Sequence, residues 1–299
     1  MARGGSSNVL MAASEFKWFD DILVVGDGNF SYSYDLNVQR NVAAGGAKGR
    51  EKGYMMATSF DSLIDLKGKY DDAEYYIEHL KEDGVDVIHE VDARNLSETL
   101  PRASVKTLKF DCIIFNFPLV PLTQTAEERS KTPGKNVCVA NRNLIWRFIK
   151  SSTLLLKNLN SRVFVTSKVC NPYDRWRIAS LGPGFIKSVP FDWSSFYHYQ
   201  VRKVNVIHRS KKQKVGFPTN SDNVRTFIFE PNNVRKHGKM SPGSQEASSV
   251  IATETRFLCH ICRIECKSMN EFLAHCTGKR HKRLMIAEKK WRIFLIQFN

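Results

Sequence analysis

A glycine-containing turn near residue 26 has the residue types needed to hold an adenosyl group. The apolar run Ile22–Val25 leads directly into Gly26-Asp-Gly28-Asn-Phe-Ser31. A buried parallel strand delivers its carboxyl end to a nucleotide-like ligand in this way, and Gly28 lets the backbone approach that ligand without a Cβ in between. Because Ser31 stands where a dinucleotide-binding turn has its third glycine, the turn favours an adenosyl ligand over a nicotinamide cofactor.

Two carboxylates are expected at the ends of the next two strands. Asp61 follows Ala57-Thr-Ser-Phe and can accept two hydrogen bonds from a ribose diol, or alternatively cap the turn ahead of Ser62. Asp92 can accept a hydrogen bond from an adenine amino group, or alternatively serve as a turn residue. The predicted cofactor-binding residues are therefore Gly26, Asp27, Gly28, Asn29, Asp61 and Asp92.

A fourth strand is expected to end in Phe115-Asn116-Phe117-Pro118. In methyltransferases that act on amino groups, an Asn or Asp followed by Pro and an aromatic residue lies beside the methyl group. The carboxamide of Asn116 can accept a hydrogen bond near the target nitrogen, Phe117 can stack on a base, and Pro118 stiffens the backbone. These three residues are predicted to line the target-base pocket.

Alternating strand-like and helix-like segments are expected to position these residues. A parallel α/β sheet with helical crossovers follows from that alternation. The later segments Tyr173–Leu181 and Tyr197–His208 are predicted to be a helix and a strand. The other predicted strands are Asp21–Val25, Tyr54–Ser59, Asp86–Val91, Asp111–Asn116, Arg162–Lys168, Ile186–Phe191 and Val224–Glu230, and the other helices are Ser31–Asn41, Tyr70–Asp83 and Val139–Leu159.

Near the carboxyl end, two cysteines and two histidines have the spacing of a zinc finger. The pattern is Cys259-x2-Cys262-x12-His275-x5-His281, and these four ligand types suit tetrahedral zinc. Two histidines six residues apart do not share a face of an ideal helix, so Gly278 is expected to allow a local distortion. Cys266 is predicted to belong to the small core of the finger and not to bind the metal.

The charge of the chain points to a polyphosphate partner. The formal net charge is +15, and residues 231–299 hold 13 Lys and Arg against 5 Asp and Glu. Such an excess favours nucleic acid, although a solvated basic surface is the plainer alternative. The sequence shows no signal peptide and no membrane-length apolar run, and its seven cysteines form no disulfide framework. We therefore expect a protein of the nucleus, nucleolus or cytoplasm that is not secreted.

The combination of motifs resembles the large-subunit rRNA uridine-N3 methyltransferase-like family. The resemblance covers about residues 20–230 and rests on Gly-Asp-Gly-Asn-Phe-Ser, Ala-Thr-Ser-Phe-Asp, Val-Asp-Ala, Phe-Asn-Phe-Pro and Pro172-Tyr-x-x-Trp176, in this order. It implies a Rossmann-like class I methyltransferase fold, S-adenosylmethionine as methyl donor and a uracil of rRNA as substrate.

The chemistry implied by this resemblance needs a group that removes or weakens the N3 proton of uracil. Asp27 or Asn116 can accept a hydrogen bond locally, and Lys168 at the end of the fifth strand can stabilise negative charge on a uracil oxygen. Methylation at carbon 5 would instead need a cysteine nucleophile, for which Cys112 and Cys170 are the candidates. The predicted catalytic residues are Asn116, Phe117, Pro118 and Lys168.

The finger resembles the U1-like or matrin-type class, whose members often bind double-stranded RNA. The resemblance rests on His275-Cys-Thr-Gly-Lys-Arg-His281-Lys-Arg, where the basic residues suit phosphates. The alternative is a finger that binds protein. We expect that removal of residues 232–299 weakens RNA binding and leaves cofactor binding intact.

The sequence thus predicts three segments: a methyltransferase-like domain over residues 20–230, a linker over 231–255, and a small ββα-type zinc finger over 256–290. The predicted function is S-adenosylmethionine-dependent RNA methylation, assisted by the zinc-bound finger. A non-catalytic RNA-binding or ribosome-associated protein with the same fold is the second possibility, and a nicotinamide oxidoreductase is the third.

Overall fold

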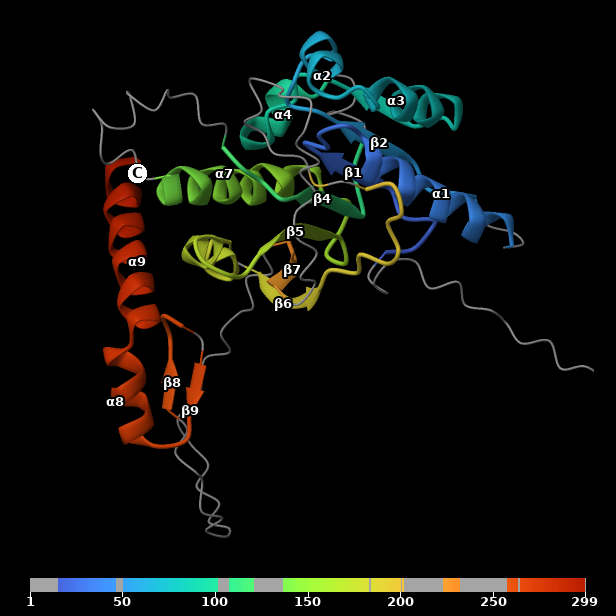
Figure 1. The fold of residues 1–299 in the computed structure, drawn as a ribbon. Helices are drawn as coiled ribbons and strands as arrows, with labels where there is room; N and C mark the ends of the chain where they lie inside the picture. The colour runs from blue at the N-terminus through green and yellow to red at the C-terminus, as the bar shows by residue number, and fades with distance from the viewer. Residues whose placement is uncertain are drawn as a thin grey trace, which may run out of the picture.

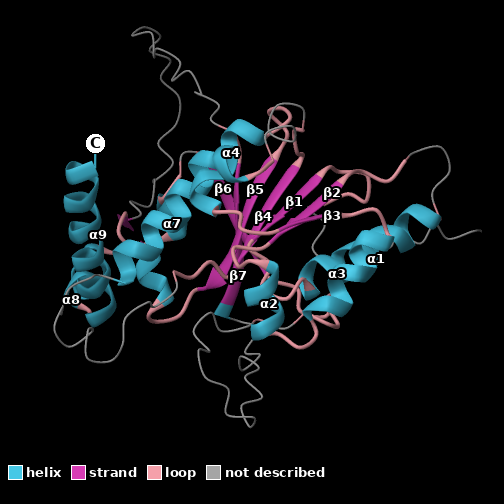
Figure 2. Ribbon diagram, turned by 90° about the horizontal axis from the view of Figure 1, so that it is seen from above, coloured by secondary structure: helices cyan, strands magenta, loops and turns pink. Residues whose placement is uncertain are grey.

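A computed structural model describes residues 16–46, 51–101, 108–120, 137–182, 184–199, 201, 223–231, 257–262 and 264–298. Its centre is a seven-stranded sheet in the order β3-β2-β1-β4-β5-β7-β6 (Figure 2). Strands β1 to β5 are parallel, whereas β7 is antiparallel to both of its neighbours. The order confirms the Rossmann-like class I methyltransferase fold predicted from the sequence.

The strand bounds agree closely with the predicted ones. They are β1 Ile22–Val25, β2 Met55–Thr58, β3 Asp86–Ile88, β4 Cys112–Asn116, β5 Arg162–Lys168, β6 Phe185–Pro190 and β7 Val224–Phe229. The central strands β1 and β2 are buried along their whole length, because helices cover both faces of the sheet. The segment Tyr197–Tyr199 forms no strand, and residues 202–208 of that prediction lie outside the described residues.

Helices of the two layers pack on opposite faces of the sheet (Figure 1). On one face lie α1 Ser31–Gly45, α2 Leu63–Lys69 and α3 Ala73–Glu82, and on the other lie α4 Leu96–Thr99 and α7 Val137–Ser152. Alternate residues of β1 go to different cores: Ile22 and Val24 pack with α1, whereas Leu23 and Val25 pack with α7. The sheet therefore packs against a hydrophobic core on each of its two faces, and this packing fixes the positions of the strand ends.

Three predicted helices differ from the structure. The expected helix Val139–Leu159 ends at Ser152, as α7, and a 3₁₀ turn Thr153–Leu155 follows it. The expected helix Tyr70–Asp83 is α3, which begins at Ala73, and the separate helix α2, which Ser62 caps and which ends before Tyr70, was missed from the sequence. The segment Tyr173–Leu181 forms two short 3₁₀ turns, Tyr173–Trp176 and Ile178–Ser180. Between them Arg177 has φ = 50°, in the left-handed region, which breaks a continuous helix.

A second unit follows with the order strand, strand, helix, helix. It consists of β8 Phe257–Cys259, β9 Ile264–Cys266, α8 Met269–Thr277 and α9 Lys279–Phe298. The antiparallel pair β8–β9 and helix α8 confirm the predicted ββα arrangement. Apart from Pro231, the predicted linker lies outside the described residues, and the division into three domains stays a prediction. Among the described residues, no helix is long and apolar enough to cross a membrane.

Candidate cofactor and target-base site

The turn after β1 needs a glycine at position 26 for structural reasons. Gly26 has φ = +65°, and a Cβ there would lie 2.8 Å from Cε2 of Phe115. The next residue, Asp27, donates its backbone N–H to the carbonyl oxygen of Thr58 at 2.8 Å, which ties the turn to the end of β2. Gly26 thus permits the tight turn expected from the sequence.

Gly28 differs from Gly26 because the protein itself would tolerate a side chain there. The nearest atom to a Cβ at position 28 is the Tyr70 hydroxyl oxygen at 3.5 Å, an ordinary van der Waals distance. Gly28 and Tyr70 line both cavities of the site. The absence of a side chain at Gly28 therefore enlarges the space in the cavity.

Asp27 points into the protein beside the first turn of α1. Its side chain is 6% exposed, and Oδ2 accepts a hydrogen bond from the Ser33 backbone N–H at 2.7 Å. Burial raises the pKa of Asp27 to about 6. A carboxylate that titrates near neutrality at the edge of a cavity is a candidate functional group.

Asn29 uses its side chain to hold the turn. Its Nδ2 donates to Asp72 Oδ1 at 3.1 Å, and its Oδ1 accepts from the Ser31 hydroxyl at 2.7 Å. Both ends of the amide are thereby engaged with the protein. The predicted contact between Asn29 and the cofactor stays a prediction, and the described contacts favour a positioning role.

The larger cavity has a volume of about 230 Å³ and lies where β1, β2 and β4 end. The structure brings four predicted cofactor residues together around it, namely Gly26, Gly28, Asp61 and Asp92. Helix α7 closes it from the side with Ala140, Asn143 and Leu144. A crevice at the carboxyl ends of parallel strands is the usual ligand site of this fold class.

Asp61 does not cap the helix that follows it. Ser62 is the N-cap of α2, and its hydroxyl accepts a hydrogen bond from the Asp65 N–H at 3.2 Å. Asp61 Oδ1 instead lies 2.5 Å from Lys69 Nζ. Asp61 is therefore not the N-cap of this helix, its carboxylate lies at the cavity wall, and its contact with ribose hydroxyls stays a prediction.

Asp92 has the turn role that was its alternative interpretation. Its Oδ1 accepts a hydrogen bond from the Arg94 backbone N–H at 2.9 Å and so caps the 3₁₀ turn Ala93–Asn95. The Arg94 guanidinium also contacts both carboxylate oxygens, with Nε at 2.9 and 3.0 Å and Nη2 at 2.7 Å. The carboxylate lines the cavity, but its acceptor capacity is largely used.

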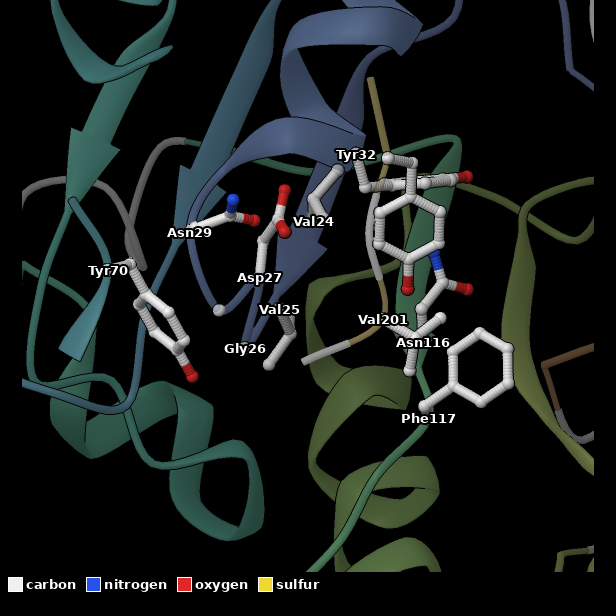
Figure 3. A pocket seen from close by; sticks show the side chains of 12 residues that line it. Val24, Val25, Gly26, Asp27, Asn29, Tyr32, Tyr70, Asn116, Phe117 and Val201 are labelled. Atoms are coloured by element: carbon white, nitrogen blue, oxygen red, sulfur yellow. The ribbon is translucent and has the colours of Figure 1, made fainter. Parts of the chain in front are cut away.

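A second cavity of about 70 Å³ adjoins the first and contains Asn116 (Figure 3). Asn116 is the last residue of β4, and its Oδ1 and Nδ2 atoms are both buried without a hydrogen-bond partner. The next residue, Phe117, has φ = 49° and donates its N–H to the Thr166 carbonyl at 2.8 Å. This left-handed turn directs the Phe117 ring toward Trp193, with centroids 5.8 Å apart and planes at 27°.

Two tyrosines of this second cavity were missed from the sequence. Tyr32 comes from α1 and Tyr199 from an irregular segment after β6, and burial raises the pKa of both hydroxyls. Neither lies at the end of a strand, so the strand-end reasoning that identified Asn116 had no way to find them. They add two hydroxyl groups beside the unpartnered carboxamide.

Lys168 and Pro118 occupy different surroundings. Pro118 is buried directly after Phe117. Lys168 ends β5, but its ammonium lies over the ring of Tyr173 at 5.8 Å, and it is not among the residues that line either cavity. The structure therefore does not bring Lys168 together with Asn116.

The four predicted metal ligands converge. One ligand atom from each of Cys259, Cys262, His275 and His281 lies within 4.8 Å of the others. His281 Nδ1 is 3.4 Å from Cys259 Sγ, 3.6 Å from Cys262 Sγ and 3.3 Å from His275 Nε2. Tetrahedral zinc with ordinary bond lengths has S···N edges of about 3.5 Å and an N···N edge of about 3.3 Å. The arrangement fits zinc.

Gly278 resolves the spacing of the two histidines. It has ψ = 148° and separates α8, which carries His275, from α9, which carries His281. The distortion expected at this glycine is therefore a full break between two helices. Cys266 is 2% exposed and lies at the end of β9, as expected for a core residue.

Helix α9 packs on the methyltransferase-like part and joins its core. Trp291 is 4% exposed and belongs to the same buried cluster as Ile145 and Phe148 of α7. Arg177 connects the two parts again, because its guanidinium contacts Glu288 and donates to the His260 carbonyl at 3.2 Å. These contacts argue against the expectation that removal of residues 232–299 leaves cofactor binding intact, because the truncation would uncover part of the core.

The same interface engages one of the basic residues near the finger. Arg283 pairs with Asp174, whereas Lys279, Arg280 and Lys282 are exposed. Of the four residues expected to meet phosphates, Arg283 is therefore engaged with the protein and the other three are free to face solvent.

Comparisons with known proteins agree with this geometry. Residues 23–203 match a family described as BMT5-like, rRNA (uridine-N3-)-methyltransferase BTM5-like. An Arabidopsis thaliana protein named "Uncharacterized protein At4g26485" is 31% identical over 186 residues, which is 61% of this chain and 81% of that protein.

Two further proteins are more distant. "Heavy metal-associated isoprenylated plant protein 41" of Arabidopsis thaliana is 26% identical over 186 residues, 61% of this chain and 32% of that protein. TrmN from Thermus thermophilus has 15% identity and a TM-score of 0.37, covering 71% of this chain and 44% of that chain. This chain therefore spans less than half the length of either protein.

Proposed function

The chain belongs to the BMT5-like family of rRNA (uridine-N3-)-methyltransferases, and on that premise we propose that it methylates N3 of a uridine in rRNA with S-adenosylmethionine as donor. Family and fold together make it an RNA methyltransferase. The observation that carries the finer proposal is the junction of the two cavities, which share Gly26, Gly28, Tyr70 and Phe117. An adenosyl group in the larger cavity and a base beside Asn116 would meet there.

The residues of the larger cavity fit the donor. Asp61 stands at the tip of β2, where its carboxylate can accept hydrogen bonds from the ribose hydroxyls. Gly28 leaves room that a side chain would fill. Bound there, S-adenosylmethionine supplies an electrophilic methyl group, and the task left to the protein is to align the target nitrogen with it.

Asn116 is the residue that we propose to orient the uracil. Both polar atoms of its carboxamide are buried and make no hydrogen bond of ordinary geometry, with the Tyr32 hydroxyl as a close polar neighbour, and a polar ligand would satisfy them. Phe117 lines both cavities, and a flat base can stack on its ring.

Removal of the N3 proton requires an acceptor and leaves negative charge on the uracil oxygens. Asp27 and Asn116 both line the smaller cavity. The Asp27 carboxylate can take the proton, whereas the Asn116 carboxamide can only accept a hydrogen bond from N3–H and so weaken the N3–H bond. The Tyr32 and Tyr199 hydroxyls line this cavity as well and can donate to a uracil oxygen. We propose that they take the role that the sequence suggested for Lys168, which lies outside both cavities.

We propose further that the finger binds one zinc ion through Cys259, Cys262, His275 and His281 and assists RNA capture. Burial and the neighbouring Cys259 raise the pKa of the Cys262 thiol to about 11, and a bound zinc ion reverses this effect by stabilising the thiolate. The exposed Lys279, Arg280 and Lys282 next to this site can contact phosphates. An rRNA substrate places the protein in the nucleus, nucleolus or cytoplasm.

The decisive experiment is methylation of rRNA from cells that lack this protein, followed by analysis of the nucleosides. We expect 3-methyluridine from the wild-type protein, and much less from Asn116→Ala at unchanged affinity for S-adenosylhomocysteine. Cofactor binding without any methylated nucleoside would favour the non-catalytic alternative. Formation of 5-methyluridine that is lost in Cys112→Ser or Cys170→Ser would favour the carbon-5 route.

A further inference from the structure

The wall that α7 contributes to the larger cavity contains a polar group without a partner. Asn143 lines this cavity between Ala140 and Leu144, and its Oδ1 atom is buried without a hydrogen bond. A buried carbonyl oxygen is normally satisfied, and one left open at the wall of a cavity is an acceptor available to a ligand.

Asp92, the acceptor that the sequence suggested for the adenine amino group, is in a different position. Its carboxylate already receives the Arg94 backbone N–H and three contacts from the Arg94 guanidinium, all between 2.7 and 3.0 Å. To accept from a ligand it would have to share oxygens that are held in a bidentate pair. No hydrogen-bond donor of the protein competes with a ligand for Asn143 Oδ1.

The position of Asn143 also fits the base end of an adenosyl group. Asp61, the proposed ribose ligand, belongs to the tip of β2, whereas α7 packs beside the turn that follows β3. That packing is fixed by a hydrogen bond of 3.0 Å from the Ser151 hydroxyl to the Ala93 carbonyl. Between these two sides the cavity has apolar walls suited to the faces of a purine, made by Val91, Phe115, Leu119 and Leu144.

We propose that Asn143 Oδ1 accepts a hydrogen bond from the exocyclic amino group of adenine and so reads the base of the methyl donor. This inference rests on the proposed function, because it takes an adenosyl donor in the larger cavity as given. Asn143 is a specificity residue for the cofactor in this scheme, and Asp92 serves to hold the 3₁₀ turn that borders the base.

The test uses a pair of ligands that differ only in the amino group. The first is S-adenosylhomocysteine, and the second is its analogue with unsubstituted purine in place of adenine. Calorimetry on the full chain should show that the wild-type protein binds the analogue about tenfold more weakly, since a buried hydrogen bond is lost. Asn143→Leu, or Asn143→Ala as a smaller replacement, should bind the two ligands with equal affinity.

Two further variants separate this role from a general effect on the cavity. Asn143→Asp keeps an acceptor oxygen and should keep the preference for the amino group. Asp92→Asn should also keep the preference, because Asp92 is not the group that reads the base. Circular dichroism would verify that each variant is folded, which is expected because Asn143 Oδ1 accepts no hydrogen bond whose loss could destabilise the fold.

Several outcomes would overturn the inference. One is an equal affinity of the wild-type protein for both ligands, and another is an undiminished preference in Asn143→Leu. A preference that disappears in Asp92→Asn but not in the Asn143 variants would return the role to Asp92. A wild-type protein that binds neither ligand would overturn the proposed cofactor, and with it this inference, so the two failures are distinguishable.

Discussion

The guanidinium of Arg142 in α7 is held by the carboxylate of Glu288 in α9, with Nη1 and Nη2 at 3.2 and 3.1 Å from the same oxygen. The Arg142 side chain is 0% exposed, and its guanidinium also lies 4.8 Å from the ring centre of Trp291. Helix α9, which also carries the candidate metal ligand His281, therefore supplies both the counter-charge and the aromatic cover for a cation in the core of the methyltransferase fold.

Glu288→Gln should destabilise the whole chain. It removes the negative charge that compensates the buried Arg142, and such a loss costs about 3 kcal/mol. Urea unfolding followed by circular dichroism would measure it. Lys289→Gln changes an exposed residue of the same helix and should have little effect. Equal stability of the two variants would show that the Arg142–Glu288 contact is of no consequence.

Trp291→Ala should have a comparable effect through packing. Trp291 is 4% exposed and contacts the core beneath α7, so its truncation leaves a cavity that costs about 3–5 kcal/mol. Ile293→Ala on the exposed side of α9, where the side chain is 48% exposed, is the matched control. A melting temperature that falls no further in Trp291→Ala than in the control would contradict the shared core.

Gly26→Ala and Gly28→Ala should fail in different ways. At position 26 the positive φ and the 2.8 Å approach to Phe115 make a Cβ strained, so we expect lower thermal stability. At position 28 the Cβ meets only the Tyr70 hydroxyl at 3.5 Å, so stability should persist while affinity for S-adenosylhomocysteine falls. Unchanged affinity in a folded Gly28→Ala protein would move the cofactor away from this turn.

Asp27 should make stability depend on pH. Its pKa is raised from 3.8 to about 6 in the folded protein, so the neutral form stabilises the fold below pH 4, and this contribution is lost as the pH rises through 6. Asp27→Asn cannot ionise. Between pH 4 and 7, without cofactor, the wild-type protein should lose about 3 kcal/mol relative to this variant. Parallel stability curves would show that Asp27 titrates normally.

The finger should hold one zinc ion per chain, and removal of the zinc ion should also destabilise the methyltransferase part. Since α9 carries both His281 and Trp291, a chelator should unfold the finger and also lower the melting temperature of the methyltransferase part. Cys259→Ser should reproduce the effect, whereas Cys276→Ser alters a cysteine outside the ligand set. Two independent transitions, with only one sensitive to the chelator, would support separate domains instead.

Much of the site could be predicted because the ends of buried strands can be recognised from the sequence. Apolar runs followed by Gly26, Asp61 and Asn116 predicted which residues meet at one edge of the sheet. The spacing of the four metal ligands is also a local pattern, so it could be recognised without knowledge of the rest of the fold. Contacts between distant segments left no such local pattern. Nothing near Asn143 marks it as a cavity residue, and nothing near Glu288 marks its pairing with Arg142.

The assignment of Asp92 shows a different limit. Its place after the third strand was predicted correctly, but the bidentate pair with Arg94, two residues later, takes up its acceptor oxygens. A carboxylate at this position can bind a ligand or cap a turn. Side-chain geometry decides between the two roles, and the sequence does not show that geometry.

The 146 residues that separate Arg142 from Glu288 have a consequence for biosynthesis. As the chain leaves the ribosome, α7 emerges with an arginine and an apolar surface whose cover has not yet been translated. The sheet can begin to form at that stage, but its second core closes only when α9 arrives, and contacts of such long sequence separation form slowly. During that interval the nascent chain exposes the apolar side of α7 that Trp291 covers in the folded protein.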